Sequence, residues 1–340
     1  MMIASSSVAM QGGEAARAVP SPFSVVAIDI GGTKIAGCIA LYEAVGSGPT
    51  VTERRCMPTD AQKGGDDVLT RVCELGTELC QIARADETHP LLGVGVSSAG
   101  TIRTSDGLVS YANDLMPGWM GQPLGERLSQ VCSTTVAVLN DVHAHAMGEV
   151  RHGAAKGARV AIMAAAGTGL GGAVIIDGKV FFGAHGFAGT LGHSLHPAAV
   201  GRPSGWSGTG HLESVVSGSG IEECYRSRGG EALSGGEISC RANQGEPLAR
   251  EVIEQSGRAL GEAIASWADI IDPEVVVIAG SVCKAGAIWR DALNAGLEGF
   301  ITPEMAGLPV VDATLGDDAP LIGAAEWLID RMQEGKQSLG

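Results

Sequence analysis

Residues 25–34 read Val-Val-Ala-Ile-Asp-Ile-Gly-Gly-Thr-Lys, and the largely apolar stretch Ile35–Ala40 follows them directly. The nearly unbroken apolar start predicts a strand that is covered on both faces. The glycine pair predicts a turn that leads into a second strand beside the first. This unit decides how the rest of the chain is interpreted, because its turn has a composition that suits phosphate binding.

Each polar or glycine residue of this turn suits an anionic ligand. Gly31 and Gly32 can adopt positive φ and bring backbone N–H groups close to an anion. Thr33 adds a hydroxyl and Lys34 an amine, while Asp29 is placed to hold a metal-bound water near phosphates. The alternative is a β-hairpin whose turn contains two glycines by chance, because short glycine motifs have many false positives.

The composition indicates an α/β protein with two domains. The chain has 340 residues, of which 45% are hydrophobic and 51 are glycine, enough for two cores and many strand-to-helix turns. No apolar run approaches the length of about 18 residues that a membrane span needs. The net charge of −15 makes nucleic acid an unfavourable partner, because binding would oppose phosphate repulsion.

The cysteines and the N-terminal segment bear on localisation. Eight scattered cysteines without a C-x-x-C pair are typical of reduced, packed thiols in a cytoplasmic protein rather than of a disulfide framework. The N-terminal segment is rich in Ser, Ala and Gly and has no basic start. We therefore expect residues 1–23 to be a flexible leader and not a signal peptide.

The hydrophobic pattern predicts alternating strands and helices after this leader. In the first half, the expected strands are 25–28, 35–42, 51–56, 91–96 and 135–139. The expected helices there start at Asp66 and cover 124–131 and 142–151, with an irregular loop at 110–119. In the second half, the expected strands are 159–166, 173–176, 180–182, 275–279 and 310–313. Helices are expected at 248–271, 288–297 and 321–332, whereas 183–219 shows little periodicity.

The unit of strand, glycine turn and strand occurs twice, at Asp29–Lys34 and again at Ala166–Gly172. This repetition indicates an internal duplication of architecture, although the residues hardly repeat. Two further polar sites, Asn140-Asp141 and Gly280-Ser281, also follow apolar strands. Since ligands bind beyond the carboxyl ends of strands in open α/β sheets, these four sites predict a cleft in which two glycine turns hold a polyphosphate. A plain glycine turn at Gly167–Gly172 is the alternative.

Asp141 is the candidate catalytic residue. Phosphoryl transfer to an alcohol needs alignment, a metal and a carboxylate that accepts the hydroxyl proton. A carboxylate at a strand end that opens a helix is held rigidly, as such alignment requires. The local sequence favours another explanation, in which Asp141 caps the helix that begins at Val142. Capping and catalysis can coexist.

The order of these motifs resembles that of the ROK family of sugar kinases and regulators, within the actin/hexokinase-like ATPase superfamily. The resemblance spans about Val25–Met332 and implies an α/β fold of two actin-like (ribonuclease H-like) domains that flank a cleft. The expected division is a small domain of residues 24–134 completed by 319–340, and a large domain of residues 135–318. The motifs that match are, in chain order, Asp29–Lys34, Ala112–Trp119, Leu139–Asp141, Gly167–Gly169, Gly192-His193, Gly210–Glu213 with Ser217-Gly218, and Ile278–Gly280.

The resemblance implies an ATP-dependent kinase that transfers the γ-phosphate of Mg-ATP to a hexose or N-acetylhexosamine of the glucose, mannose or N-acetylmannosamine type. Asp141 would be the base, and Asp29 would organise Mg²⁺ through water. The residues implied to bind ATP and its phosphates are Asp29, Gly31, Gly32, Thr33, Lys34, Gly167, Thr168, Gly169 and Gly280. Those implied to bind the sugar are Asn113, Asn140, Asp141, His193 and Glu213. A homodimer is the assembly that the family suggests.

The chain departs from the family pattern on the sugar side. The family typically has Glu-x-Gly-His where this chain has Thr190-Leu-Gly-His193, so a carboxylate that would accept bonds from sugar hydroxyls is absent. Ser204, Trp206 and His211 occupy the places of three zinc-binding cysteines. Because thiolates make that site a closed tetrahedral centre, the usual zinc is not expected here.

Histidines and tryptophans of the same region allow other roles. A substitute metal site made of His193, His196 and His211 is one alternative, but histidines in glycine-rich loops more often form hydrogen bonds or face water. Trp119 and Trp206 are expected to pack their loops rather than to stack on a sugar.

Two other functions stay open. A kinase-like protein that binds sugar without phosphorylating it would explain the lost glutamate and cysteines, but it leaves Asp29, Asp141 and both glycine turns without a use. A sugar-responsive regulator would carry an N-terminal helix-turn-helix, for which a leader of about two dozen residues is too short. The negative net charge is also unfavourable for DNA binding.

Overall fold

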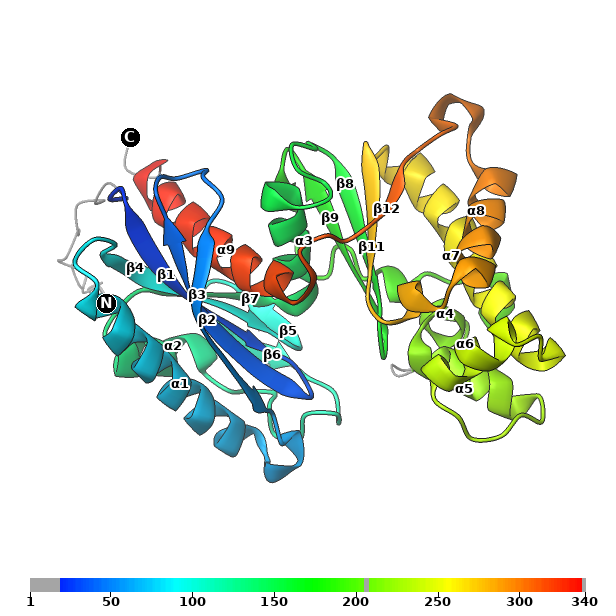
Figure 1. Cartoon of the computed structure of the whole chain (residues 1–340), viewed down its shortest axis with the longest axis horizontal. Coiled ribbons are helices and arrows are strands. Elements are labelled where there is room, and N and C mark those ends of the chain that lie inside the picture. The colour runs from blue at the N-terminus through cyan, green and yellow to red at the C-terminus, as the bar shows by residue number, and fades with distance from the viewer. Residues whose placement is uncertain (1–18, 205–207, 338–340) are drawn as a thin grey trace, which may run out of the picture.

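The structure is a computed structural model that describes residues 19–204 and 208–337. Two five-stranded sheets lie on either side of a central pair of helices (Figure 1). Residues 1–18 of the expected leader lie outside the described residues, and so does Trp206.

The first sheet has the strand order β3-β2-β1-β4-β7. Its strands are β1 (Phe23–Ile30), β2 (Lys34–Tyr42), β3 (Thr50–Pro58), β4 (Leu91–Ser98) and β7 (Val136–Asn140). β1 runs antiparallel to β2 and parallel to β4, and β4 runs parallel to β7. The predicted unit of strand, glycine turn and returning strand is therefore confirmed.

The second sheet repeats this connectivity with the order β10-β9-β8-β11-β12. Its strands are β8 (Ala161–Ala166), β9 (Leu170–Ile176), β10 (Lys179–Val180), β11 (Val275–Ala279) and β12 (Val310–Asp312). β8 runs antiparallel to β9 and parallel to β11, as β1 does to β2 and β4. The predicted duplication of architecture is confirmed, because the first strand of each sheet has the same neighbours in the same directions.

The helices form three layers around the sheets (Figure 1). The outer face of the first sheet is covered by α1 (Gly65–Ala85) and α2 (Leu124–Cys132). Between the sheets lie α3 (Asp141–His152) and α9 (Ala319–Gln337). The outer face of the second sheet is covered by α4 (Glu213–Val216), α5 (Gly218–Ser227), α6 (Gly235–Asn243), α7 (Pro247–Ile271) and α8 (Ala287–Phe300). The 3₁₀ turns are η1 (Ala61–Lys63), η2 (Leu191–His193), η3 (Pro197–Ala199), η4 (Val282–Lys284), η5 (Pro303–Met305) and η6 (Gly316–Asp318).

β1 is buried on both faces, as its apolar run predicts. Val26 and Ile28 belong to the core under α1 and α2, whereas Val25 and Ala27 belong to the core that contains α3 and α9. All four are 0% exposed. Full burial of an aliphatic side chain as large as valine or isoleucine contributes about 1.5–3 kcal/mol, so this strand anchors both layers.

The sequence misplaced the start of β1 and missed several short elements. Phe23 belongs to the strand and not to a leader, since it is buried and stacks on Tyr42 with 5.0 Å between ring centroids. A short hairpin of β5 (Thr101–Arg103) and β6 (Leu108–Tyr111) occupies part of the segment expected to be irregular. The sequence also does not predict α5 and α6. The latter begins with a capping box of Ser234 and Glu237, which was a readable start signal.

The topology bears on the division into domains. The expected boundary between residues 134 and 135 separates β7 from β4, to which it is hydrogen-bonded. The first sheet therefore continues to Asn140. We propose the same two domains with this boundary moved to the end of β7.

Two further expectations concern membranes and thiols. Within residues 19–204 and 208–337, no helix combines the length and the apolar character that crossing a bilayer requires. All eight cysteines are free thiols. Five of them are buried, and Cys56 and Cys240 are exposed, so packing explains most but not all of them.

Candidate active site

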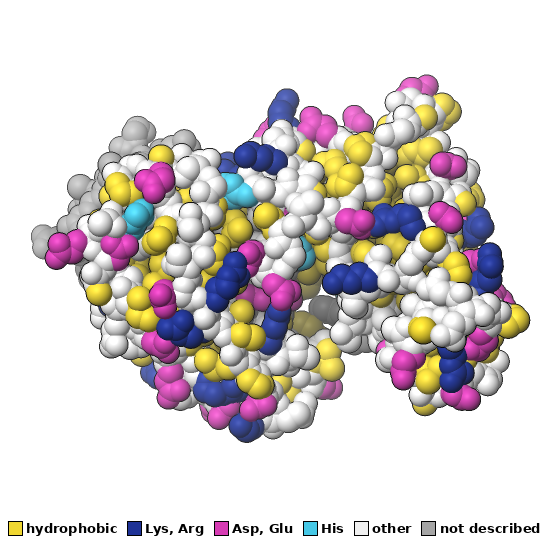
Figure 2. All heavy atoms as spheres, in the orientation of Figure 1, with side chains coloured by type: hydrophobic (Ala, Val, Ile, Leu, Met, Phe, Trp, Pro, Cys, Tyr) yellow, Lys and Arg dark blue, Asp and Glu magenta, His cyan; other side chains and the backbone are white. Residues whose placement is uncertain are grey.

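A cavity of about 660 Å³ opens between the two halves of the molecule. Figure 2 shows a hollow between these halves, with acidic and basic side chains along its rim. Its walls include residues that directly follow β4, β7, β8 and β11, together with Gly32 of the turn after β1. The lining residues that the sequence predicts as site residues are Gly32, Thr33, Asn113, Asn140, Asp141, Gly167, Thr168, Gly169, His193, Glu213 and Gly280. Asp29, Gly31 and Lys34 do not contribute to the lining.

The first glycine turn is held from below by Thr59, a residue that the sequence did not single out. The Thr59 hydroxyl donates to the Gly31 carbonyl at 2.6 Å, and its N–H donates to the Thr33 carbonyl at 3.0 Å. Gly31 N–H donates to the Lys34 carbonyl at 3.0 Å. A Cβ built on Gly32 would meet nothing within 4 Å, so there is open space above the turn.

Asp29 lies near the end of β1, just before this turn, and pairs with Ser97 of the neighbouring strand β4. The Ser97 hydroxyl donates to Asp29 Oδ1 at 2.6 Å. Burial raises the pKa of Asp29, and the Ser97 bond and the charge of Lys34 oppose this. Lys34 forms an exposed ion pair with Asp317, with 2.8 Å between Nζ and Oδ2. This pair raises the pKa of Lys34 and contributes little stability, since exposed pairs are worth about 0–1 kcal/mol.

The second glycine turn is tied to the helical layer of the second sheet. Gly167 N–H donates to the Gly169 carbonyl at 2.9 Å, which closes the turn. Gly218 N–H donates to the Gly167 carbonyl at 2.8 Å, and the Ser219 hydroxyl donates to the Thr168 carbonyl at 2.7 Å. The turn is thus fixed from the side of α5. A Cβ added to Gly167 would meet no atom within 4 Å, so this turn also has open space beside it.

Gly280 closes the same wall from the end of β11. Its φ is +97°, and a Cβ there would lie 2.2 Å from the Ala166 carbonyl oxygen. Only glycine fits, because both the backbone conformation and the close approach exclude a side chain.

Asn140 is the N-cap of α3, and Asp141 is the first residue of the helix. Asn140 Oδ1 accepts from the N–H groups of Val142 at 3.0 Å and His143 at 3.3 Å. The explanation in which Asp141 serves as the cap is therefore wrong. Asn140 Nδ2 donates to the Gly100 carbonyl and to Asp141 Oδ1, both at 2.8 Å. Asn140 thus fixes the orientation of the Asp141 carboxylate.

The surroundings of Asp141 disfavour its charged form. Burial and the nearby charge of Asp29 raise the pKa of Asp141 to about 7, against opposing bonds from Val142 N–H and Asn140. A carboxyl group with a pKa near the working pH is suited to accept and release a proton.

Glu213 and His193, which the sequence predicts to bind sugar, also line the cavity, and Glu213 lies beside the second glycine turn. Glu213 begins α4, and its Oε2 accepts from Leu170 N–H at 2.9 Å. The imidazole rings of His193 and His211 stack with centroids 4.8 Å apart and planes 10° apart. Burial and the neighbouring His211 lower the pKa of His193, against the charge of Glu213. His211 Nδ1 lies 2.8 Å from the Ser204 hydroxyl.

The substitute metal site of three histidines is not formed. His196 lies in another direction, where its Nε2 is 3.2 Å from Glu262 and its Nδ1 accepts from Ala198 N–H at 3.2 Å. In the part of the chain that the structure describes, no cluster of three or more His, Cys, Asp or Glu side chains is arranged to hold a metal ion.

Thr190 and Asn113, which line the cavity, and the buried Trp119 use their polar groups locally. The Thr190 hydroxyl donates to the Phe187 carbonyl at 2.7 Å. Asn113 Oδ1 accepts from Leu115 N–H at 3.2 Å, which shapes the loop. Trp119 is 0% exposed, and its Nε1 donates to Ser98 Oγ at 3.2 Å. Trp119 therefore packs the loop, as expected.

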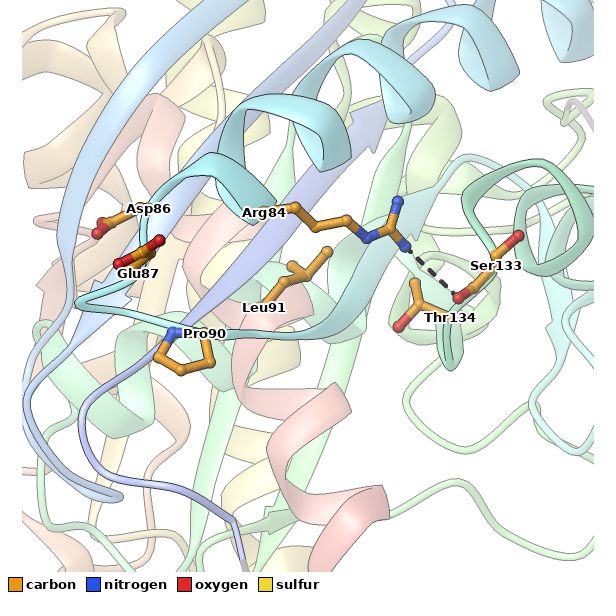
Figure 3. Close-up of a pocket in the computed structure, with 7 residues that line it drawn as sticks. All are labelled: Arg84, Asp86, Glu87, Pro90, Leu91, Ser133 and Thr134. Atoms are coloured by element: carbon orange, nitrogen blue, oxygen red, sulfur yellow. Dashed lines mark hydrogen bonds between the residues drawn. The ribbon is translucent and has the colours of Figure 1, made fainter.

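A separate cavity of about 390 Å³ lies at the end of α1 (Figure 3). Arg84 donates to the backbone carbonyls of Cys132 and of Ser133, the latter at 3.4 Å. These carbonyls end α2, where a cation is favourable for the helix dipole. The Arg84 side chain thus stabilises the C-terminal end of α2. None of the predicted site residues lines this cavity.

The chain is similar to known sugar kinases along most of its length. The ROK family matches residues 25–331. The glucokinase of Halalkalibacterium halodurans is 29% identical over 332 residues, which cover 93% of this chain and 97% of that protein. The N-acetylmannosamine kinase of Shigella flexneri is 30% identical over 307 residues, which cover 89% and 97%.

Solved structures of similar proteins share the fold. A ROK hexokinase from Thermus thermophilus has a TM-score of 0.78 and 27% identity, over 92% of this chain and 100% of that one. A ROK family glucokinase from Streptomyces griseus, in complex with glucose and AMPPNP, has a TM-score of 0.71 and 27% identity. The match covers 89% of this chain and 98% of that one. A ROK family transcriptional regulator, a homologue of the E. coli MLC protein, has a TM-score of 0.77 and 25% identity. The match covers 93% of this chain and 80% of that one. The predicted actin-like α/β fold is thereby confirmed, and the chain belongs to the ROK family.

Proposed function

We propose that the protein is an ATP-dependent sugar kinase. The observation that carries this proposal is the position of Asp141, a carboxyl group with a pKa of about 7 in the cavity that both glycine turns line. The relatives named glucokinase and N-acetylmannosamine kinase, and the glucokinase complex with glucose and AMPPNP, support the same class of reaction.

Asp141 accepts the proton of the sugar hydroxyl. As the hydroxyl oxygen forms its bond to the γ-phosphorus, the bond from that phosphorus to the ADP oxygen breaks and the proton moves to the carboxylate. Asn140 Nδ2 and Val142 N–H hold Oδ1 of Asp141. The base is thereby aligned before the substrate arrives. We assign Asn140 this orienting role in addition to the predicted contact with sugar.

The two glycine turns cradle the phosphates. Gly32 and Thr33 face the cavity from the first sheet, and Thr168 and Gly169 face it from the second. The open space above Gly32 and Gly167 lets a phosphate approach the backbone, which a side chain would block. Lys34, at the rim, balances phosphate charge if its pair with Asp317 opens.

Two neighbouring carboxylates, Asp29 near the end of β1 and Asp141 after β7, fit Mg²⁺. Asp29 and Asp141 are two carboxylates close enough for one charge to raise the pKa of the other. Mg²⁺ prefers oxygen ligands and often takes one or two carboxylates together with substrate phosphates and water. When bound, the ion would neutralise charge on the phosphates. We propose that Asp29 holds it through water.

The acceptor is a hexose or an N-acetylhexosamine of the glucose, mannose or N-acetylmannosamine type. Asn113, His193 and Glu213 line the cavity and would offer amide, imidazole and carboxylate groups to its hydroxyls. Thr190 cannot supply the second carboxylate that the family typically has there. We therefore expect a preference that differs from that of plain glucose kinases.

We also propose a homodimer through the loop beside α7. Trp267 Nε1 donates to Ser194 Oγ at 3.0 Å, which holds this loop against the helix. Leu195 is 76% exposed, Val200 is 78% exposed, and Ile270 at the end of α7 is 76% exposed. Exposed apolar side chains of this kind favour a protein partner. Light scattering after size exclusion tests the mass.

The kinase is tested by release of ADP in the presence of a panel of hexoses and N-acetylhexosamines. We expect release that depends on one class of sugar. Asp141→Asn should lower kcat by roughly 10²–10⁴-fold, the usual contribution of a general base. The variant keeps the size of the side chain, so its affinity for sugar should change little.

A sugar-binding protein without kinase activity is the competing function, favoured by the missing carboxylate at Thr190. It predicts thermal stabilisation by a sugar with no ADP release from any member of the panel. That result would overturn the kinase.

A further inference from the structure

The chain crosses between the two sheets twice. It crosses first through residues 153–160, between α3 and β8, and returns through residues 313–318, between β12 and α9 (Figure 1). Glu149, near the end of α3, lies where these crossings meet. Glu149 is 0% exposed. Full burial is unusual for a carboxylate unless it has strong hydrogen-bond partners.

The partners of Glu149 come from both crossings. On the outward crossing, Ala154 N–H donates to Oε2 at 2.7 Å. On the return crossing, the N–H groups of Thr314 and Leu315 donate to Oε1 at 3.0 and 2.8 Å, and the Thr314 hydroxyl donates to Oε2 at 3.2 Å. Hydrogen bonds to a charged acceptor are stronger than neutral ones. One carboxylate therefore ties both connections between the domains to a single point.

The backbone around this point is built to admit the carboxylate. A Cβ on Gly153 would lie 2.0 Å from Glu149 Oε2. On the same helix, Gly148 lies so close to α9 that a Cβ would be 2.3 Å from the Ala319 carbonyl oxygen. The facing Gly323 lies equally close to Ala144, at 1.8 Å from its carbonyl oxygen. The helix α3 is thus packed against α9 with little room to adjust, and Gly153 leaves space for the carboxylate on the outward crossing.

We propose that Glu149 is a positioning residue that acts on Asp141 through α3. The two side chains are on one helix, eight residues apart, which corresponds to about 12 Å along its axis. A change in how one sheet sits relative to the other must pass through the two crossings, and both are bonded to Glu149. The carboxylate therefore sets where Asp141 lies relative to the second glycine turn. The kinetic part of this inference rests on the proposed kinase activity.

Glu149→Gln tests the inference with the least change of shape. The amide oxygen can still accept from Thr314 and Leu315, but the amide nitrogen would face the N–H of Ala154. We expect exchange of the Ala154, Thr314 and Leu315 amide hydrogens to accelerate by about ten-fold or more, since each loses a charged acceptor. If the protein is a kinase, kcat should fall by about ten- to a hundred-fold, with KM for the sugar nearly unchanged.

Two variants serve as controls. Thr314→Val removes only the hydroxyl contact and keeps both backbone donors, so it should change kcat and exchange little. Ser256→Ala removes a buried hydroxyl that accepts from Trp289 Nε1 at 3.2 Å, far from the crossings. It should lower the melting temperature without lowering kcat.

The outcomes separate this inference from the proposed function. Unchanged amide exchange in Glu149→Gln overturns it, whatever the activity. Faster exchange with unchanged kcat also overturns the positioning role and leaves a structural one. Absence of sugar phosphorylation in the unaltered protein rejects the kinase, but the exchange measurement still decides whether Glu149 holds both crossings.

Discussion

Burial and the charge of Asp29 together raise the pKa of Asp141, although the two residues come from strands that are not neighbours. Asp29 is on β1 and Asp141 directly follows β7, and β4 lies between these strands in the sheet. Ser97 of β4 donates to Asp29, and Asn140 donates to Asp141. Two carboxylates are thus held close together by separate partners, so that a cation between them would favour the charged form of both.

This relationship predicts how activity depends on pH. Because the pKa of Asp141 is raised to about 7, the free enzyme has a protonated base at lower pH. We expect kcat/KM for the sugar to fall about ten-fold per pH unit below pH 7 and to level off above it. A profile measured from about pH 5 to pH 9 checks this. A flat acid limb would contradict the assignment of Asp141 as the base.

The same pKa predicts a cost in stability. The carboxyl group of Asp141 holds its proton more tightly when folded, since its pKa rises from 3.8 to about 7. Its favourable contribution is complete below pH 3.8 and is lost as the pH rises through 7. Asp141→Asn should therefore stabilise the protein at pH 8 by roughly a few kcal/mol, since one pKa unit corresponds to about 1.4 kcal/mol.

Thermal melts at two pH values test this cost. The gain in melting temperature from Asp141→Asn should be larger at pH 8 than at pH 4. An equal gain at both values would mean that ionisation of this carboxyl is not its source.

Two glycines of the cavity wall predict different effects when replaced by alanine. One change should weaken ATP binding and the other should lower stability. Gly167→Ala places a methyl group in open space, so the melting temperature should stay within a few degrees while the KM for ATP rises about ten-fold or more. Gly280→Ala places a methyl group 2.2 Å from the Ala166 carbonyl at a φ of +97°. It should destabilise the fold by about 1–3 kcal/mol.

The test compares the KM for ATP and the melting temperature of the two variants. ATP titrations and melts of both variants should separate a ligand-blocking effect from a folding effect. If Gly167→Ala loses stability and keeps its affinity for ATP, the turn does not face a phosphate.

The histidines proposed to lie near the sugar predict a protein that does not need zinc. Ser204 and His211, which occupy two of the places expected for zinc-binding cysteines, bond to each other, and His211 stacks on His193. We expect metal analysis to find no stoichiometric zinc and a chelator to leave the melting temperature unchanged. About one zinc per chain would contradict this.

Thr190→Glu should restore a carboxylate in the cavity. A charged acceptor for a sugar hydroxyl contributes about 1.5–3 kcal/mol, so KM for a sugar with a suitably placed hydroxyl should fall roughly ten-fold. Thr190→Gln is the matched control, because it has the same length without the charge. Equal KM values for the two variants would show that the site does not use a carboxylate there.

Much of the fold follows from local sequence patterns. Apolar runs such as Val25–Ile28 and Val275–Ala279 predict strands covered on both faces, because each side chain needs an apolar neighbour. The repeated glycine turns predict the duplication, and the strand ends predict where the cavity lies. These are properties of short segments, and a sequence displays them directly.

The tertiary structure decided what local patterns cannot contain. Asp141 could have been a helix cap on sequence alone, but Asn140 takes the cap. The fold buries Asp141 and brings Asp29 near it from across β4, and both effects raise its pKa. Glu149 looks like an ordinary helix residue until residues more than 160 positions later bond to it. The turn at residues 31–34 began as a hairpin with two glycines. Its place opposite Gly167–Gly169 depends on contacts between distant segments, which only folding creates.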